Sequence, residues 1–410
     1  MKTTLHFVIR AGLGCALSLL AEGVLGQNSL TFVSRAALPV AHYGMGYCND
    51  QQNIYQAGGG NLTAAYTSDV YRYELATNTW TVGAAMVTPQ RLGTAALLPS
   101  GSGTSLAYVL NGSGANGLNI PVPQLESVLA VSGQSGPSFA NPLPTVSAGV
   151  AVWNGLLYSY GGINGTTYSN ALRSCNPNTN AWTTLAPMPV ARTIAGAAVN
   201  GKIYVFGGYD GVVNYSRVDA YDIASNQWQA LPDLPTTVSN QAVAVQGEWI
   251  WLVGDFTNQN YLAAYNTRTA QLRTFTSNLP PRRNAGAAII NNQLYVWGGN
   301  TAAANSSALA DMWRADISFL VMSATAAARK KVLQAYPNPS VSGRFRVLLP
   351  GAKDTRLIVR DAHGREVRNL LVPRGHAAYE LDLENQPVGL YLVEAQEGGQ
   401  PAGQCRLVRQ

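Results

Sequence analysis

A histidine and three arginines stand at matching places in the sequence. Each lies four residues before a small residue, and a serine and an asparagine hold the same place elsewhere. The set is His42, Arg91, Ser147, Arg192, Asn240 and Arg283. Guanidinium groups gathered in a ring would attract an anion, because guanidinium pairs well with carboxylate. The pattern therefore nominates His42, Arg91, Arg192, Asn240 and Arg283 as ligand-binding residues, while the competing interpretation is that these arginines bond to neighbouring backbone.

Segments rich in Asn, Tyr, Thr and Asp follow at similar intervals. They carry Asn61, Tyr66, Asn164, Tyr168, Asp210, Asn214, Tyr215, Asp255, Asn258, Tyr261, Asn300 and Asn305. Flat aromatic rings beside amides suit a sugar, which offers both a CH face and hydroxyl groups, although the same residue types also suit turns. Asp210 and Asp255 are the acids in these segments that could bind a ligand or act as a general base.

Other chemistry has little support in the sequence. Between Gln27 and Ala328 the one histidine is His42, and no His, Cys and carboxylate cluster has metal-ligand spacing. No nucleophile elbow, phosphate loop or Ser-His-Asp arrangement appears, so we expect no metal, no cofactor and no catalytic residue of those kinds. Lys plus Arg and Asp plus Glu are both 12 over this region, which predicts no field that would recruit nucleic acid.

A repeat positions these residues. A hydrophobic strand ending in a residue pair whose second member is Gly recurs about every fifty residues. The pairs are Gly58-Gly59, Asn111-Gly112, Gly161-Gly162, Gly207-Gly208, Val253-Gly254 and Gly298-Gly299. An aromatic residue opens a short strand after each of the first five pairs: Trp80, Phe139, Trp182, Trp228 and Phe275. This resembles the kelch repeat over nearly all of residues 30–319.

The resemblance implies a six-bladed β-propeller, with four antiparallel strands in each blade. The glycines are then expected where the backbone is crowded or adopts unusual dihedral angles. The large apolar rings of Trp80, Trp182 and Trp228 are expected to pack between neighbouring blades. The sixth copy lacks its outer strand, and residues 32–39 match 182–189, so the N-terminal strand is expected to close the ring. In such a ring the nominated residues would surround the mouth of the central channel.

The ends of the chain indicate export. Residues 1–26 have a positive start, an apolar stretch and small residues before Gln27, which predicts a cleaved signal peptide. No later segment is long and apolar enough to span a membrane. Cys48, Cys175 and Cys405 are too few and too scattered for a disulfide framework, so we expect small buried side chains.

The tail forms a separate pattern. Residues 321–331 read as a linker, and after it stand Tyr336-Pro-Asn-Pro, the Asp361-to-Gly364 turn and Gly389-Leu-Tyr, in that order. Alternating strands over 332–410 predict a small immunoglobulin-like β-sandwich. This resembles the C-terminal sorting domain of the bacterial type IX secretion pathway. The resemblance implies the type IX secretion machinery as a partner, and a secreted or cell-surface protein that has crossed the periplasm.

Two functions follow from these expectations. The first is a binding module for a glycan or a surface protein, built on a propeller over residues 27–320. The alternative is a metal-free carbohydrate-active enzyme that resembles the sialate mutarotases, which are also six-bladed kelch propellers. That enzyme would need a carboxylate base beside the arginines, and Asp210 and Asp255 are the acids available.

Overall fold

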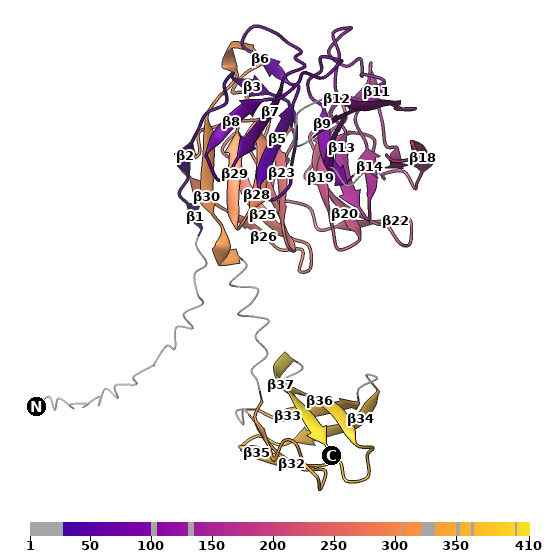
Figure 1. Cartoon of the computed structure of the whole chain (residues 1–410), viewed down its shortest axis with the longest axis vertical. Helices are drawn as coiled ribbons and strands as arrows, with labels where there is room; N and C mark the ends of the chain where they lie inside the picture. The colour runs from indigo at the N-terminus through magenta and orange to yellow at the C-terminus, as the bar shows by residue number, and fades with distance from the viewer. Residues whose placement is uncertain are drawn as a thin grey trace, which may run out of the picture. The chain divides into compact units, whose positions relative to one another are not determined.

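The computed structural model describes residues 28–99, 105–129, 135–303, 305–320, 333–349, 353–361, 365–397 and 400–410. The predicted signal peptide and the predicted linker at 321–331 lie outside these residues. The chain divides into two compact units, the first ending at Ile317 and the second covering Ser318–Gln410 (Figure 1).

The prediction of an all-β chain is confirmed, since helical residues among those described are limited to Asn305–Ser307 and 318–320. The first unit contains six four-stranded antiparallel sheets, numbered here in chain order. Sheet 1 is β4 (Gly46–Asn49), β5 (Asn53–Ala57), β7 (Val70–Glu74) and β8 (Thr79–Val82). Sheet 2 is β9 (Thr94–Pro99), β10 (Ser105–Leu110), β11 (Gln124–Leu129) and β12 (Ser135–Ala140). Sheet 3 is β13 (Gly149–Trp153), β14 (Leu156–Tyr160), β17 (Leu172–Asn176) and β18 (Ala181–Thr184).

The remaining sheets repeat this order. Sheet 4 is β19 (Thr193–Val199), β20 (Lys202–Tyr209), β21 (Val218–Asp222) and β22 (Gln227–Leu231). Sheet 5 is β23 (Ala242–Gln246), β24 (Trp249–Val253), β25 (Leu262–Asn266) and β26 (Leu272–Thr274). Sheet 6 is β28 (Gly286–Ile290), β29 (Gln293–Trp297), β30 (Met312–Asp316) and β2 (Val33–Arg35).

The six sheets form a closed ring. Their first strands contact one another in chain order, and β28 of sheet 6 contacts β4 of sheet 1. The strand that completes sheet 6 comes from the N-terminus, because β2 pairs antiparallel with β30. This is the pairing that the match between residues 32–39 and 182–189 predicted.

A second N-terminal strand extends the closure to sheet 5. The strand β1 (Ser29–Leu30) pairs in parallel with β27 (Thr276–Ser277). Next to it, the side chain of Asn278 accepts a bond from the amide of Phe32 and donates one to its carbonyl, at 2.7 and 3.0 Å. Phe32 is itself buried. The N-terminal segment therefore joins sheets 5 and 6.

Aromatic residues fill the spaces between neighbouring sheets. Trp228 packs with the cluster shared by sheets 3 and 4, and its indole donates to the carbonyl of Ala186 at 2.8 Å. Trp80 packs between sheets 6 and 1 and donates to Ala36 at 2.9 Å. Trp182 lies against the cluster of sheets 2 and 3. These rings supply the large apolar area that stacked sheets need.

The glycine pairs lie where the second strand of each sheet ends. The first member of each pair has a left-handed backbone that favours glycine, with φ of 66° at Gly58 and 70° at Gly161. Gly254 has φ of 70° and therefore corresponds to the first member, not the second as the sequence alignment placed it. Asp255 holds the second place in that copy, because the pair there is Gly-Asp.

The second unit contains two antiparallel sheets. One is β31 (Ala335–Tyr336), β32 (Arg344–Leu348) and β35 (Ala378–Asp382). The other is β34 (Glu366–Val372), β33 (Thr355–Asp361), β36 (Gly389–Glu397) and β37 (Gln400–Arg409). Residues from both sheets share one core, including Phe345, Leu357, Val393 and Leu407. Cys48, Cys175 and Cys405 are free thiols; Cys175 and Cys405 are buried, as expected, whereas Cys48 is partly exposed.

Candidate functional site

The segments that enter the first strands meet the glycine pairs at one end of the ring, which we call the loop face. The small pairs β3 (His42–Tyr43) with β6 (Gly60–Asn61), and β15 (Ile163–Asn164) with β16 (Thr167–Tyr168), also lie there. The nominated residues occupy three successive positions of these segments. We call first the residue whose carbonyl accepts a hydrogen bond from the glycine pair of the preceding sheet, as the carbonyl of Arg192 accepts from the amide of Gly162 at 2.9 Å. The next two residues of the segment hold the second and third positions.

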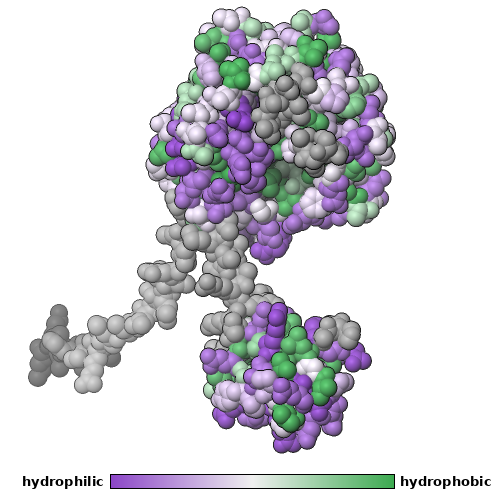
Figure 2. Space-filling model, viewed as in Figure 1, coloured by the Kyte–Doolittle hydropathy of each residue, from purple (hydrophilic) through white to green (hydrophobic). Residues whose placement is uncertain are grey.

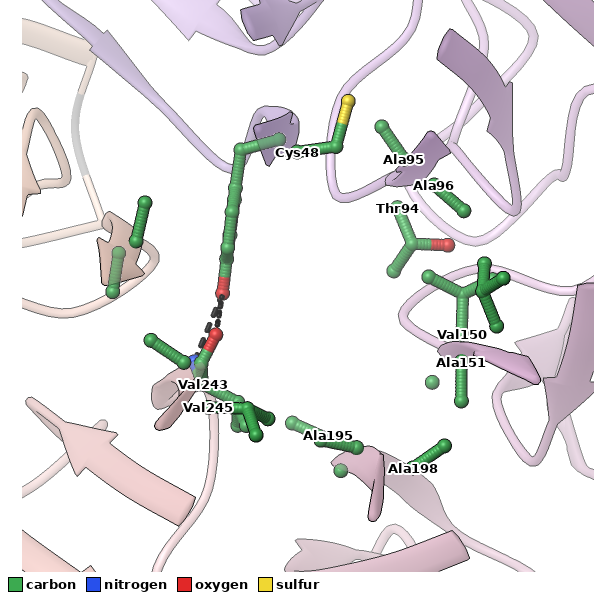
Figure 3. A pocket seen from close by; sticks show the side chains of 18 of the residues that line it. Cys48, Thr94, Ala95, Ala96, Val150, Ala151, Ala195, Ala198, Val243 and Val245 are labelled. Carbon is green, nitrogen blue, oxygen red and sulfur yellow. Dashed lines mark hydrogen bonds between the residues drawn. The ribbon is translucent and has the colours of Figure 1, made fainter. Parts of the chain in front are cut away.

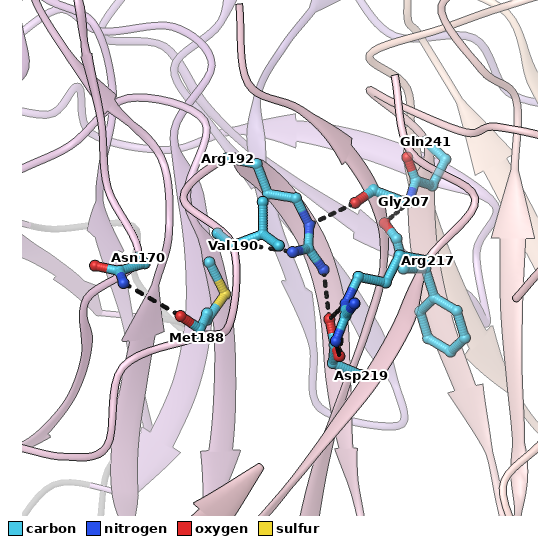
Figure 4. A network of polar contacts seen from close by, with 9 residues as sticks. Asn170, Met188, Val190, Arg192, Gly207, Arg217, Asp219 and Gln241 are labelled. Atoms are coloured by element: carbon cyan, nitrogen blue, oxygen red, sulfur yellow. Dashed lines mark hydrogen bonds and ion pairs between the residues drawn. The ribbon is translucent and has the colours of Figure 1, made fainter. Parts of the chain in front are cut away.

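Arg192 holds the first position in sheet 4 and is fully buried. Its Nε donates to the carbonyl of Gly207 at 2.7 Å, and its Nη2 donates to the carboxylate of Asp219 at 2.8 Å (Figure 4). Its Nη1 lies 3.4 Å from the carbonyl of Val190. Arg217 also bonds to Asp219, so the carboxylate lies between two guanidinium groups. Arg192 therefore braces the glycine pair and offers no nitrogen to a ligand.

Sheets 1 and 6 have the same kind of brace. His42 is buried, and its Nε2 lies 3.0 Å from the carboxylate of Asp69. In sheet 6 the buried residue is Arg282, which bonds to the carbonyl of Gly298 at 3.2 Å and to Asp311 at 2.8 Å. The counterpart of Arg192 is thus Arg282, one residue before Arg283. His42 and Arg192 lie inside sheets, away from the channel mouth.

Arg91 holds the second position and lies on the loop face. Its Nη1 donates to the hydroxyl of Tyr43 at 2.5 Å, and its guanidinium carbon lies 5.0 Å from the ring centre of Tyr66. The side chain is partly exposed. Among the described residues no carboxylate forms an ion pair with Arg91. Two tyrosines therefore hold an arginine whose charge is unpaired within the described part of the chain.

Arg283 holds the second position in sheet 6, but it leans over a different loop. Its guanidinium carbon lies 4.0 Å from the ring centre of Phe256, and its Nη1 donates to the carbonyl of that residue at 3.3 Å. Burial lowers the pKa of Arg283. Because Arg91 leans toward sheet 1 and Arg283 toward sheet 5, the structure does not bring the predicted arginines together.

Ser147 and Asn240 hold the third position, at the axis of the ring. Residues at this position join neighbouring sheets through backbone hydrogen bonds. The amide of Asn284 donates to the carbonyl of Asn240 at 3.1 Å, and the amide of Ser147 donates to the carbonyl of Leu92 at 3.1 Å. A cavity of about 120 Å³ is lined by Leu92, Ser147, Asn240 and Asn284. The space between the sheets is therefore narrow at this end of the ring.

The channel beyond is lined mainly by small apolar side chains. It has a volume of about 410 Å³, and its walls are mostly Ala and Val (Figure 3). The hydroxyl of Tyr47 crosses from sheet 1 to sheet 5, where it lies 2.9 Å from the amide and 3.3 Å from the carbonyl of Val243. Burial raises the pKa of Tyr47 to about 12, so the phenol stays neutral. Figure 2 shows a hollow with hydrophobic residues in the visible face of the first unit.

The two candidate acids hold their own loops in shape. Asp210 accepts from the amides of Val212 and Val213 at 2.9 and 2.8 Å and from the hydroxyl of Tyr215 at 2.6 Å. These bonds, the hydroxyl first, lower the pKa of Asp210 to about 2. Asp255 is buried and accepts from three backbone amides at 2.6–2.9 Å. Both carboxylates therefore act as turn braces.

Some residues of this region were missed in the sequence. Tyr43, which orients Arg91, precedes the glycine Gly44 and carried no separate signal. Arg282 was passed over because the spacing to a small residue selected its neighbour. Within the part of the chain that the structure describes, no group of three or more His, Cys, Asp or Glu could hold a metal ion. No helix of the described residues has the length and hydrophobicity needed to cross a membrane.

Comparison with known protein families gives matches in both parts of the chain. The Kelch motif matches residues 144–189 and 193–235, and the Secretion system C-terminal sorting domain matches residues 334–408. No curated protein matches the chain. Among solved structures, one titled "Structure of YjhT" is similar, with 16% identity and a TM-score of 0.58. The similarity covers 68% of this chain and 95% of that one, and it shows the fold alone.

The sorting domain indicates secretion through the type IX system, to the cell surface or outside. The motif matches fall on sheets 3 and 4, where the braces around Arg192 and the glycine pairs were described above. The chain contains kelch motifs at residues 144–189 and 193–235 and a secretion system C-terminal sorting domain at residues 334–408.

Proposed function

We propose that this chain is a secreted or cell-surface binding module that recognises a carboxylate-bearing ligand on its loop face. The first unit, residues 27–320, is in this proposal a six-bladed kelch propeller, and residues 332–410 form an immunoglobulin-like sandwich. The signal peptide at 1–26 takes the chain to the periplasm, and the sorting domain takes it across the outer membrane.

One observation carries the proposal. Arg91 is partly exposed on the loop face, two tyrosines fix its position, and no described carboxylate pairs with it. A guanidinium that is already oriented loses little entropy when it binds a carboxylate with two parallel hydrogen bonds. Tyr66 beside it is aromatic, and Asn61 of the same loop is polar, so a sugar acid fits this corner of the face better than a free inorganic anion.

The enzyme alternative has less support. A general base in a neutral reaction needs a pKa near the working pH, whereas the pKa of Asp210 is lowered to about 2. Asp255 is buried with its oxygens bonded to backbone amides. Neither acid is available to take a proton from a sugar bound at Arg91, and so binding is the better conclusion.

A glycan array tests the proposal. The chain, labelled on its tail, should bind glycans that end in uronic or sialic acids and should not bind their neutral counterparts. Acidic peptides printed on the same array distinguish a protein ligand from a sugar. If acidic and neutral glycans and acidic peptides all give no signal, the proposed function is wrong.

A further inference from the structure

Sheet 2 differs from sheets 1, 4 and 6, each of which has an ion pair with a buried basic residue. In sheets 1, 4 and 6 a basic residue at the first position pairs with an acid that the third strand or its entry carries: His42 with Asp69, Arg192 with Asp219, and Arg282 with Asp311. In sheet 2 the first position is Gln90. Its carbonyl accepts from Gly59 N at 2.8 Å, as that of Arg192 accepts from Gly162.

The acid is nevertheless present in sheet 2. Glu126 lies opposite Val109 in β10, just as Asp219 lies opposite Val205 in β20. Both valines stand two residues before the first member of their glycine pair. Glu126 therefore corresponds to Asp219, whose carboxylate lies next to the Arg192 guanidinium in Figure 4.

The side chains of Gln90 and Glu126 carry buried polar atoms that have no hydrogen-bond partner among the described residues. Gln90 is 1% exposed and Glu126 is 4% exposed. Among the described residues, Oε1 and Nε2 of Gln90 and Oε1 of Glu126 are buried with no hydrogen-bond partner. The other oxygen of Glu126 accepts from the amide of Val87 at 3.0 Å. The Gln90 side chain covers Gly112 so closely that a Cβ there would collide with its amide, as the stem of Arg192 covers Gly208.

A buried carboxylate without a positive partner is costly, because burial removes the water that solvates it. Arginine is longer than glutamine, so the Gln90 side chain does not reach as far as the guanidinium of Arg192 reaches in sheet 4. Glu126 and Gln90 each have a buried oxygen without a hydrogen-bond partner among the described residues, and hard oxygen ligands suit small cations. One carboxylate and one neutral oxygen balance a single positive charge.

We infer that sheet 2 binds a small monovalent cation from solution, Na⁺ or K⁺, between Glu126 and Gln90. The ion takes the place that the guanidinium of Arg192 holds in sheet 4. This site lies inside a sheet and is independent of the ligand proposed for the loop face.

Thermal unfolding of the full chain tests the site. Tryptophan fluorescence is followed in KCl, in NaCl and in choline chloride of the same concentration, since choline is too large to enter. Above the dissociation constant, each tenfold rise in K⁺ or Na⁺ should raise the Tm by roughly 2–4 °C relative to choline. Equal Tm values in all three salts would overturn the inference.

Variants locate the effect. E126Q should lose the difference between salts, whereas E248Q, which removes an exposed carboxylate elsewhere, should keep it. Q90R should also lose it, because its guanidinium supplies the charge; if Q90R does not fold, E126Q still decides. A salt difference that survives in E126Q would contradict the site. Crystals soaked in Rb⁺ should give an anomalous peak between Gln90 and Glu126. If no anomalous peak appears there, the site holds no cation and the proposal is wrong.

Discussion

Replacing Arg192 by methionine should lower the free energy of unfolding of the first unit by about 3 kcal/mol. The guanidinium donates at 2.7 Å to Gly207 and at 2.8 Å to Asp219, in a fully buried place. Breaking a buried ion pair costs about 3–5 kcal/mol, because the remaining charge stays buried. We expect the lower end of this range, since Arg217 still bonds to Asp219 in the variant. Methionine keeps most of the apolar stem.

The assay is selective for the first unit. All 8 tryptophans lie before Ser318, so their fluorescence reports the ring and not the sorting domain. A loss of this size should lower the Tm by roughly 6–12 °C. The matched control is R268M, which removes an exposed pair with Glu248 at the opposite end of the ring and should cost less than about 1 kcal/mol.

The result that would refute this reasoning is specific. If R192M is as stable as the wild type but binds an acidic ligand more weakly, the guanidinium belongs to a binding site and the brace interpretation is wrong.

Further predictions concern closure, the channel, pH and export. Deleting residues 28–35 should remove β2 and expose an edge of sheet 6, so that light scattering shows aggregation and fluorescence loses its cooperative transition. Y47F should lose the link to Val243 and about 1 kcal/mol of stability in urea titrations; an unchanged midpoint would mean that water replaces the hydroxyl. The pKa of Asp210 is lowered, so its stabilising contribution is full above the unfolded-state value and is lost as pH falls toward about 2. The stability gap between wild type and D210N should therefore shrink from pH 5 to pH 2, and a constant gap would contradict this. A chain ending at residue 330 should stay in the periplasm with its tryptophan emission intact, and its normal secretion would count against the sorting assignment.

Periodicity was enough to predict much of the architecture. The glycine pairs and the tryptophans recur with the strands that carry them, and the N-terminal match located β2. The register of the strands was harder to predict, because the length of a repeat does not determine which residues of neighbouring strands pair. The repeat pattern predicts Gly254 as the second member of its pair, whereas its backbone angle shows that it is the first.

The candidate site was predicted less well, for a similar reason. Counting back four residues assumes that the small residue holds the same place in every first strand, yet Gly46 follows the third position Gly44 by two residues, whereas Ala151 follows the third position Ser147 by four. The counted residues therefore fall on three positions: His42 and Arg192 inside sheets, Arg91 and Arg283 on the loop face, and Asn240 at the axis. The pairing of basic residues with acids on the third strand was also invisible, since the partners are 27 to 29 residues apart.

The binding proposal depends on one side chain, and one titration tests it. Calorimetry with sugar acids should show binding by the wild-type chain, about 10- to 150-fold weaker binding by R91A, and unchanged binding by R268A. Tryptophan fluorescence should show that R91A remains folded. Undiminished affinity in R91A, or no heat with any carboxylate ligand, would contradict the assignment of the loop face at Arg91 as the binding site.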